Sequence, residues 1–173
     1  MKTAIFGLLI LLGIALPALG EISPEEQRQR PAKDAALYQE IPESYRGRTG
    51  VFLVKEPTPT QSADTIFTYR LINLSEAPIY YSGYDAASPL IRLQERKSGK
   101  WREWQVIVDC GHGIGTSSLP PQKSVLIEVS SQQIVVNLSK GAESRRLTED
   151  SRIGINILSS DENAHRNTIW SKP

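Results

Sequence analysis

Residues 65–74 read TIFTYRLINL, and this stretch decides the fold class. Side chains along a β-strand point alternately to opposite sides of the sheet. Phe67, Tyr69 and Leu71 therefore share one face, and the mostly polar residues between them share the other. An apolar face opposite a polar face is typical of a strand in an antiparallel sheet that covers a core on one side.

The same pattern continues outward from this strand. Short runs rich in β-branched and aromatic residues are separated, every eight to twelve residues, by Gly, Pro, Ser and Asn, which is the spacing of all-β sandwiches and barrels. No convincing helical period lies among them, which disfavours an α/β fold. The sequence predicts a single all-β, antiparallel sandwich of about seven to nine strands, at residues 51–55, 65–74, 78–81, 90–97, 101–109, 124–129, 133–138 and 152–158, with a short last segment at 168–170.

Alternation also predicts the core and one hairpin. Glycine at position 99 provides the positive φ that a tight connection between the strands around residues 96–100 requires. We expect the core nucleus to consist of the inward side chains of three strands: Phe67, Tyr69, Leu71, Val125, Ile127, Val129, Ile153, Ile155 and Ile157.

The N-terminus has the features of a secretory signal peptide. Lys2 precedes a thirteen-residue apolar run, and small residues occupy the −3 and −1 positions of a cut after Gly20. The run is shorter than the ~20 residues that span a bilayer. No cysteine follows the cut, since Cys110 is the only one in the chain, which excludes a lipoprotein anchor. We expect residues 1–20 to be cleaved and the product to be periplasmic or extracellular, with no membrane anchor.

The charge and composition of the chain limit the classes of partner and indicate how the chain divides into domains. Loss of Lys2 leaves 19 basic and 19 acidic residues, and a neutral chain has no net attraction for nucleic acid. Residues 21–49 are polar and interrupted by three prolines, so they predict a flexible lead-in with at most a short helix over 32–40, starting at Pro31. Residues 50–173 are expected to form the single β-sandwich domain.

The segment around Cys110 and His112 is the most unusual part of the chain. A thiol and an imidazole in a glycine-rich loop can bind zinc or copper, or act as nucleophile and base. The alternation of the preceding strand instead places Cys110 on the inward face, where burial makes a thiol inert. The only other histidine is His165. The favoured interpretation is a buried cysteine followed by a bent loop, with no metal, no cofactor and no catalytic residue.

Other candidate features have simpler structural interpretations. Trp101 and Trp104 are expected to face opposite sides of their strand, and residues 116–121 and 139–150 are expected to be loops. Tyrosines at positions 80, 81 and 84 could form a sugar-binding or peptide-binding patch, although packing against neighbours is the favoured interpretation. The glycosylation patterns that begin at Asn73 and Asn137 are treated as chance matches.

Three segments together resemble a known architecture. They are FTYRLINLSEAPI at 67–79, GKW at 99–101 and LPPQKSVLI at 119–127. Their order resembles the small immunoglobulin-like or fibronectin-like sandwiches of bacterial exported proteins, and is similar to the sandwich of the intracellular proteinase inhibitor type. The resemblance covers residues 51–158 and departs at Pro121-Gln122, where those sequences usually have Pro-Gly. It implies a fold class and no functional residue.

These observations favour one function and leave two alternatives. The favoured function is an exported, non-enzymatic module that binds a protein or a cell-envelope component through its loops or an edge strand. The first alternative is a protease inhibitor that acts through an exposed loop at residues 116–123. The second is a metal-binding domain that uses Cys110 and His112.

Overall fold

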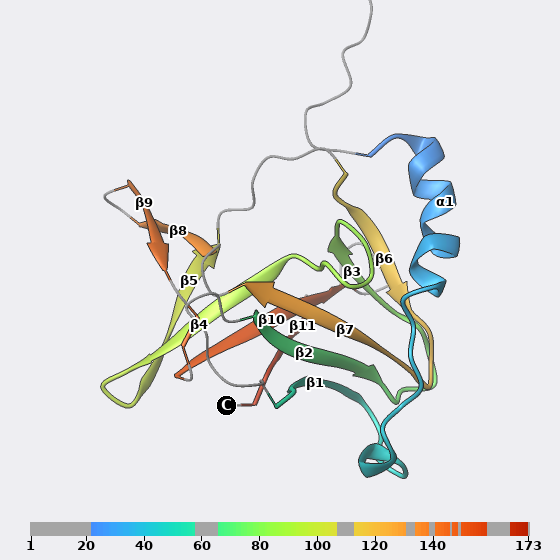
Figure 1. Cartoon of the computed structure of the whole chain (residues 1–173), viewed down its shortest axis with the longest axis horizontal. Helices are drawn as coiled ribbons and strands as arrows, with labels where there is room; N and C mark the ends of the chain where they lie inside the picture. Colours follow the sequence, from blue (N-terminus) through green and yellow to red (C-terminus); the bar gives the residue numbers. More distant parts are fainter. Residues whose placement is uncertain are drawn as a thin grey trace, which may run out of the picture.

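The computed structural model describes residues 22–57, 66–106, 113–130, 134–138, 141–145, 147–148, 150–158 and 167–172. These residues form eleven strands, one α-helix and one 310 turn. Two antiparallel sheets pack against each other as a β-sandwich (Figure 1), which confirms the predicted fold class. The signal peptide expected at 1–20 lies outside the described residues. Among the residues that are described, no helix is long and apolar enough to cross a membrane.

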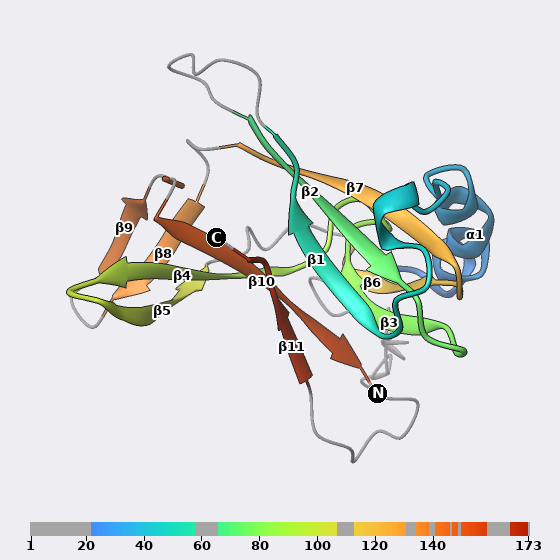
Figure 2. The ribbon, with the colours of Figure 1, turned by 90° about the horizontal axis from the view of Figure 1, so that it is seen from below.

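The small sheet has three strands and the large sheet has eight (Figure 2). Named so that each strand pairs with the next, the small sheet contains β1 (Val51–Lys55), β2 (Ile66–Asn73) and β7 (Lys123–Ser130). The large sheet contains β6 (Gly115–Leu119), β3 (Ile79–Gly83), β10 (Ser151–Leu158), β4 (Ile91–Lys97), β5 (Lys100–Val106), β8 (Ile134–Leu138) and β9 (Gly141–Arg145), with β11 (Asn167–Trp170) also paired to β10. Every predicted strand is present, whereas β6 and β9 were not predicted.

The predicted core nucleus is confirmed. The register of β2 against β7 brings the inward residues of both strands opposite each other, as in the pairs Tyr69–Ile127 and Leu71–Val125. Eight of the nine predicted side chains are buried, and the ninth, Ile157, is half-buried against the same cluster. The 96–100 hairpin is also confirmed, because Lys97 pairs with Lys100 and Gly99 has a φ of 77°.

Strands β3 and β4 lie along the same edge of β10. Strands β4 and β11 both pair with Gly154 and Ile155, so they occupy opposite edges of β10. Strands β3 and β11 both pair with Ile157, so β3 shares the edge that β4 uses. The connection at residues 84–90 therefore interrupts one continuous line of pairing. It stays close to the sheet through an isolated bridge between Gly83 and Pro89.

Two segments that were expected to be loops contain strands. Residues 116–119 belong to β6, which pairs with β3 from Ile79–Leu119 to Gly83–Gly115. Ser117 and Leu119 alternate inward and are 1% and 0% exposed. The run TSSL has little intrinsic strand preference, so pairing with β3 and burial of alternate residues decide its structure. The expected exposed loop at 116–123 is therefore wrong: it is a strand, a turn and the start of β7. Residues 141–145, expected as loop, form β9 in a hairpin with β8.

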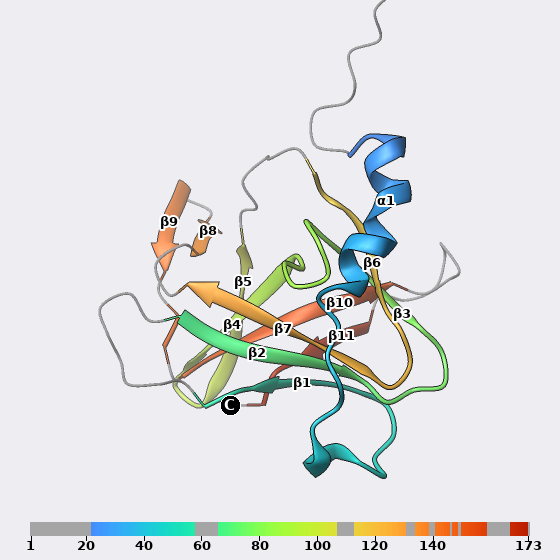
Figure 3. The same ribbon diagram turned by 45° about the vertical axis from the view of Figure 1, so that its right-hand side comes forward.

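The expectation for the N-terminal segment is also wrong in its detail. Helix α1 covers Pro24–Ala35, with Pro31 inside it, rather than 32–40. Ser23 and Glu26 form a reciprocal capping box, a start signal that was present in the sequence and overlooked. Helix α1 is polar on all sides and so shows no apolar period. It packs on β6 at one end of the sandwich (Figure 3), and a 310 turn, η1 (Glu43–Tyr45), follows before β1.

The outer face of the large sheet carries a stack of aromatic and cationic side chains. The guanidinium of Arg152 lies 4.2 Å from the ring centre of Trp101 and 5.2 Å from that of Trp170, and its burial lowers the pKa of Arg152. Gly154 makes room for Trp170, because a Cβ there would lie 2.7 Å from the indole. Trp104 packs against the core on the opposite face, as the alternation predicted.

Candidate functional site

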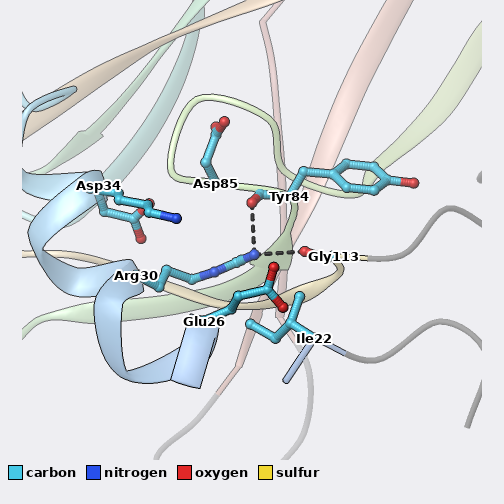
Figure 4. A pocket seen from close by; sticks show the side chains of 8 residues that line it. Ile22, Glu26, Arg30, Asp34, Tyr84, Asp85 and Gly113 are labelled. Atoms are coloured by element: carbon cyan, nitrogen blue, oxygen red, sulfur yellow. Dashed lines mark hydrogen bonds between the residues drawn. The ribbon is translucent and has the colours of Figure 1, made fainter. Parts of the chain in front are cut away.

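A pocket lies between α1 and the loop that interrupts the β3–β4 edge (Figure 4). Its volume is about 130 Å³, below the ~300–1,000 Å³ that is typical of small-molecule sites. The lining consists of three carboxylates, two cations, an aromatic residue, an apolar residue and a glycine: Glu26, Asp34, Asp85, Arg30, Lys33, Tyr84, Ile22 and Gly113. The pocket is large enough for the end of a side chain.

Arg30 connects the helix to the sheet at the base of this pocket. It is 6% exposed, and its guanidinium donates to the backbone oxygens of Gly83, Tyr84 and Gly113, each at 2.7 Å. A further contact reaches the Ser117 hydroxyl at 3.4 Å. Hydrogen bonds from a charged donor are stronger than those from a neutral one. One helical side chain thus holds the end of β3, the start of the following loop and the segment before β6.

Glycines allow the helix to approach the sheet closely. A Cβ at position 115 would lie 2.5 Å from both the Gln27 Oε1 and the Ile22 Cδ1 atoms. Gly113 has a φ of 112°, a backbone conformation that favours glycine. The favoured interpretation of the sequence placed these glycines in a bent loop that follows the strand of Cys110. The described part instead uses Gly115 as the surface against which α1 packs.

Asp34 is the most buried charged residue at the site. It is 1% exposed, and its Oδ1 accepts a 2.9 Å hydrogen bond from the backbone N–H of Ala86. Its Oδ2 is also buried and has no hydrogen-bond partner among the described residues. Burial of a carboxylate oxygen without a donor is unfavourable. The side chain extends from α1 towards the space that Arg30 and the loop enclose (Figure 4).

Two further carboxylates at the pocket accept hydrogen bonds from backbone N–H groups two or three residues away in the chain. Glu26 accepts from the Ser23 N–H and hydroxyl through the same Oε2 atom, at 3.0 and 2.9 Å. These two hydrogen bonds lower the pKa of Glu26. The Oδ1 of Asp85 accepts from the Ala87 N–H at 2.8 Å.

A buried phenol contacts the loop after β3, and a half-buried phenol contacts β6. The hydroxyl of Tyr81 donates to the Ala86 oxygen at 2.8 Å, so Ala86 links Tyr81 to Asp34. Burial raises the pKa of Tyr81, and the charge of Asp34 raises it further. Tyr38 donates to the Ser118 oxygen of β6, and burial also raises its pKa. Both phenols therefore stay protonated at neutral pH and act as hydrogen-bond donors.

Two alternatives from the sequence concern residues other than those of this pocket. Cys110, His112 and His165 lie outside the described residues, so the metal-binding alternative stays a prediction. Across the described part of the chain, no group of three metal-ligating side chains comes together. The exposed loop at 116–123 required by the inhibitor alternative consists of β6 up to Leu119, a turn and the first residue of β7.

The tyrosine cluster divides between core and surface. Tyr81 is fully buried, and Tyr80 is half-buried on β3. Tyr84 is 37% exposed and lines the pocket. Packing, the favoured interpretation, therefore describes Tyr81, and only Tyr84 contributes to a candidate site.

Sequence reasoning missed the residues that build this site. Glu26, Arg30 and Asp34 recur every four residues and so share one face of α1. An apolar period does not reveal this helix, because it docks through charged residues. A search for charged residues at i, i+4 and i+8 after the capping signal would have found them.

Comparison of the chain with protein-family models, with curated proteins and with solved structures finds no match.

Proposed function

We propose that this chain is an exported, non-enzymatic binding module that contacts a protein, or another component of the cell envelope, through the α1 end of its sandwich. The observation that carries the proposal is the buried Asp34 oxygen without a described hydrogen-bond partner, beside the pocket. Natural proteins satisfy nearly all buried polar atoms. An unsatisfied one at a surface pocket is therefore a candidate for a donor from another molecule.

Two features of the same end support this function. Tyr84 is partly exposed beside the pocket, and exposed aromatic side chains contribute strongly to protein–protein contacts. The loop that carries it is held at both ends, since Tyr84 N–H donates to Ser88 O and Leu90 N–H donates to Ser82 O. A loop that is already ordered loses little conformational entropy on binding.

The remaining parts of the proposal come from the sequence. The signal peptide at 1–20 supports export to the periplasm or the medium, and the segments quoted above support an immunoglobulin-like domain of the bacterial exported type. The non-enzymatic character follows from the lack of a convergent catalytic set in the sequence pattern.

Site-specific photo-crosslinking tests the location of the binding surface. The exported protein would carry Tyr84→p-benzoylphenylalanine, or, as the control, the same probe at Arg46. Arg46 directly follows η1 and is exposed, and the teal segment before β1 that contains η1 lies away from α1 (Figure 3). In the envelope fraction of the source cells, we expect one adduct from position 84 that excess unlabelled protein removes, and none from position 46. Identical adducts from both positions, or none from either, contradict the proposal.

A further inference from the structure

Three carboxylates of the pocket share one arrangement. Each uses a single oxygen to accept from a backbone N–H: Asp34 from Ala86, Glu26 from Ser23, and Asp85 from Ala87. The second oxygen of each accepts no hydrogen bond from the described residues. All three side chains line the same pocket. The pocket therefore presents fixed carboxylates with free acceptor positions.

Asp34 differs from the other two carboxylates of the pocket because it is buried. Its side chain is almost completely buried, and its free Oδ2 is closed off from solvent as well. Water therefore does not replace the missing donor. Because Oδ2 is closed off, binding to it requires a side chain of the pocket lining to move, and Glu26 and Lys33 are the exposed charged side chains of that lining on α1. A ligand that donates to Oδ2 removes the cost of burying it unsatisfied.

The charges of the lining favour a cation. Three carboxylates face two basic side chains, which leaves a net charge of −1. Arg30 directs its guanidinium at three carbonyl oxygens and a hydroxyl, and it is already committed to the fold. Lys33 is exposed and can turn towards solvent.

The geometry selects an ammonium over a guanidinium. A guanidinium binds best as a fork across both oxygens of one carboxylate, and each carboxylate here has one oxygen occupied. A primary ammonium is a compact charge with three separate N–H donors, and it needs only one free oxygen of a carboxylate. The volume of about 130 Å³ accepts the end of an alkyl ammonium chain.

We propose that this pocket binds one primary ammonium group, presented by a lysine side chain of the partner protein. Asp34 is the acceptor, and Glu26 and Asp85 add negative charge to the lining of the same pocket. This inference rests on the proposed function and names the chemical group that the partner contributes. The crosslinking from position 84 and the amine titration below are independent, so failure of one is distinguishable from failure of the other.

Titration with a small amine tests the pocket directly. The exported protein, labelled with ¹⁵N, is titrated with n-butylammonium chloride, and with n-butanol as the neutral control. We expect saturable shifts of the Ala86 and Ala87 amide signals with the amine in the millimolar range, and none with the alcohol. Asp34→Asn keeps an oxygen for the Ala86 N–H and is expected to weaken amine binding at least about tenfold. Glu25→Gln, on the same helix outside the pocket, is expected to bind as the wild type does.

Other results would overturn the proposal. They are equal shifts with n-butanol, or unchanged amine binding in Asp34→Asn. If Asp34→Asn does not fold, Asp85→Asn, on the loop, is expected to weaken binding, and an unchanged affinity there rejects the proposal. A third arm blocks the α-amine of the exported protein selectively. If n-butylammonium binds only after this treatment, the chain's own N-terminus occupies the pocket, which rejects a partner lysine.

Discussion

Asn73 illustrates how one buried polar side chain organises a corner of the fold. It is 0% exposed at the end of β2. Its Nδ2 donates to the Ala77 and Leu119 oxygens, each at 2.9 Å, and its Oδ1 accepts from the backbone N–H of Ser75. The amide thus joins the turn after β2 to the end of β6. The glycosylation pattern at Asn73 coincides with a structural asparagine.

Replacement of this amide is expected to destabilise the whole domain. Asn73→Ala removes the amide from the buried Leu119 oxygen and from the part-buried Ser75 N–H, while the Ala77 oxygen keeps the Ser75 hydroxyl as a donor; each buried group left unsatisfied costs about 1–3 kcal/mol. We expect the free energy of unfolding, measured with urea, to fall by about 2–4 kcal/mol in total. Glu76→Ala, in the same turn and exposed, is the control and is expected to stay within about 0.5 kcal/mol of the wild type. Equal losses in the two variants would contradict this role for Asn73.

At the scale of elements, α1 depends on its docking. An isolated helix of twelve residues is marginal in water, and α1 has no apolar face to bury. Its start is fixed by the Ser23–Glu26 capping box, and its position by Arg30 and by the close approach at Gly115. The helix therefore contributes the acidic side of the pocket only while Arg30 holds it on the sheet.

Removal of the Arg30 contacts is expected to release the helix and leave the sandwich folded. In Arg30→Met, three backbone oxygens lose a charged donor, while the helix propensity hardly changes. We expect hydrogen exchange of the α1 amides to accelerate by at least about tenfold, with β2 and β7 unaffected. Arg28→Met is the matched control on the same helix, because Arg28 is exposed. Protection that stays intact in Arg30→Met would mean that other contacts hold α1.

At the scale of the whole molecule, tyrosines whose pKa is raised by burial make the free energy of unfolding depend on pH in the alkaline range. The pKa values of Tyr81 and Tyr38 are raised by burial, whereas an unfolded tyrosine ionises near pH 10. Above that pH the folded state therefore binds more protons than the unfolded state. Stability that is fully present below about pH 10 is lost as the pH rises further.

The expected result is a decline in the free energy of unfolding above about pH 10. In Tyr81→Phe this decline is expected to be shallower, although the variant is less stable at neutral pH because the Ala86 oxygen loses its donor. Urea unfolding at a series of pH values gives the slope directly. Tyr80→Phe is the control, since Tyr80 is only half-buried on β3, and its slope is expected to match that of the wild type. A Tyr81→Phe slope equal to that of the wild type would contradict the assignment.

The success of prediction differed between elements for physical reasons. In β2, β7 and β10, apolar residues occupy every second position on the side that enters the core. The inward faces of these strands were therefore predictable. β6 contains TSSL, in which no alternation is visible, and β3 determines its pairing. α1 has no apolar stripe and docks through hydrogen bonds. The acidic pocket could not be predicted because it combines α1 with a loop some fifty residues later in the chain.

The sequence by itself determined the all-β class, the inward faces and the hairpin at Gly99, because these follow from periodicity and from local backbone preference. Its N-terminal pattern also predicts export. Tertiary structure alone decided that β3 and β4 share one edge of β10, that β6 is a strand, and that Arg30 and Asp34 are buried against the loop between β3 and β4. The physical reason is that hydrogen bonding and burial between distant segments depend on where the chain brings them, and no local pattern records that placement.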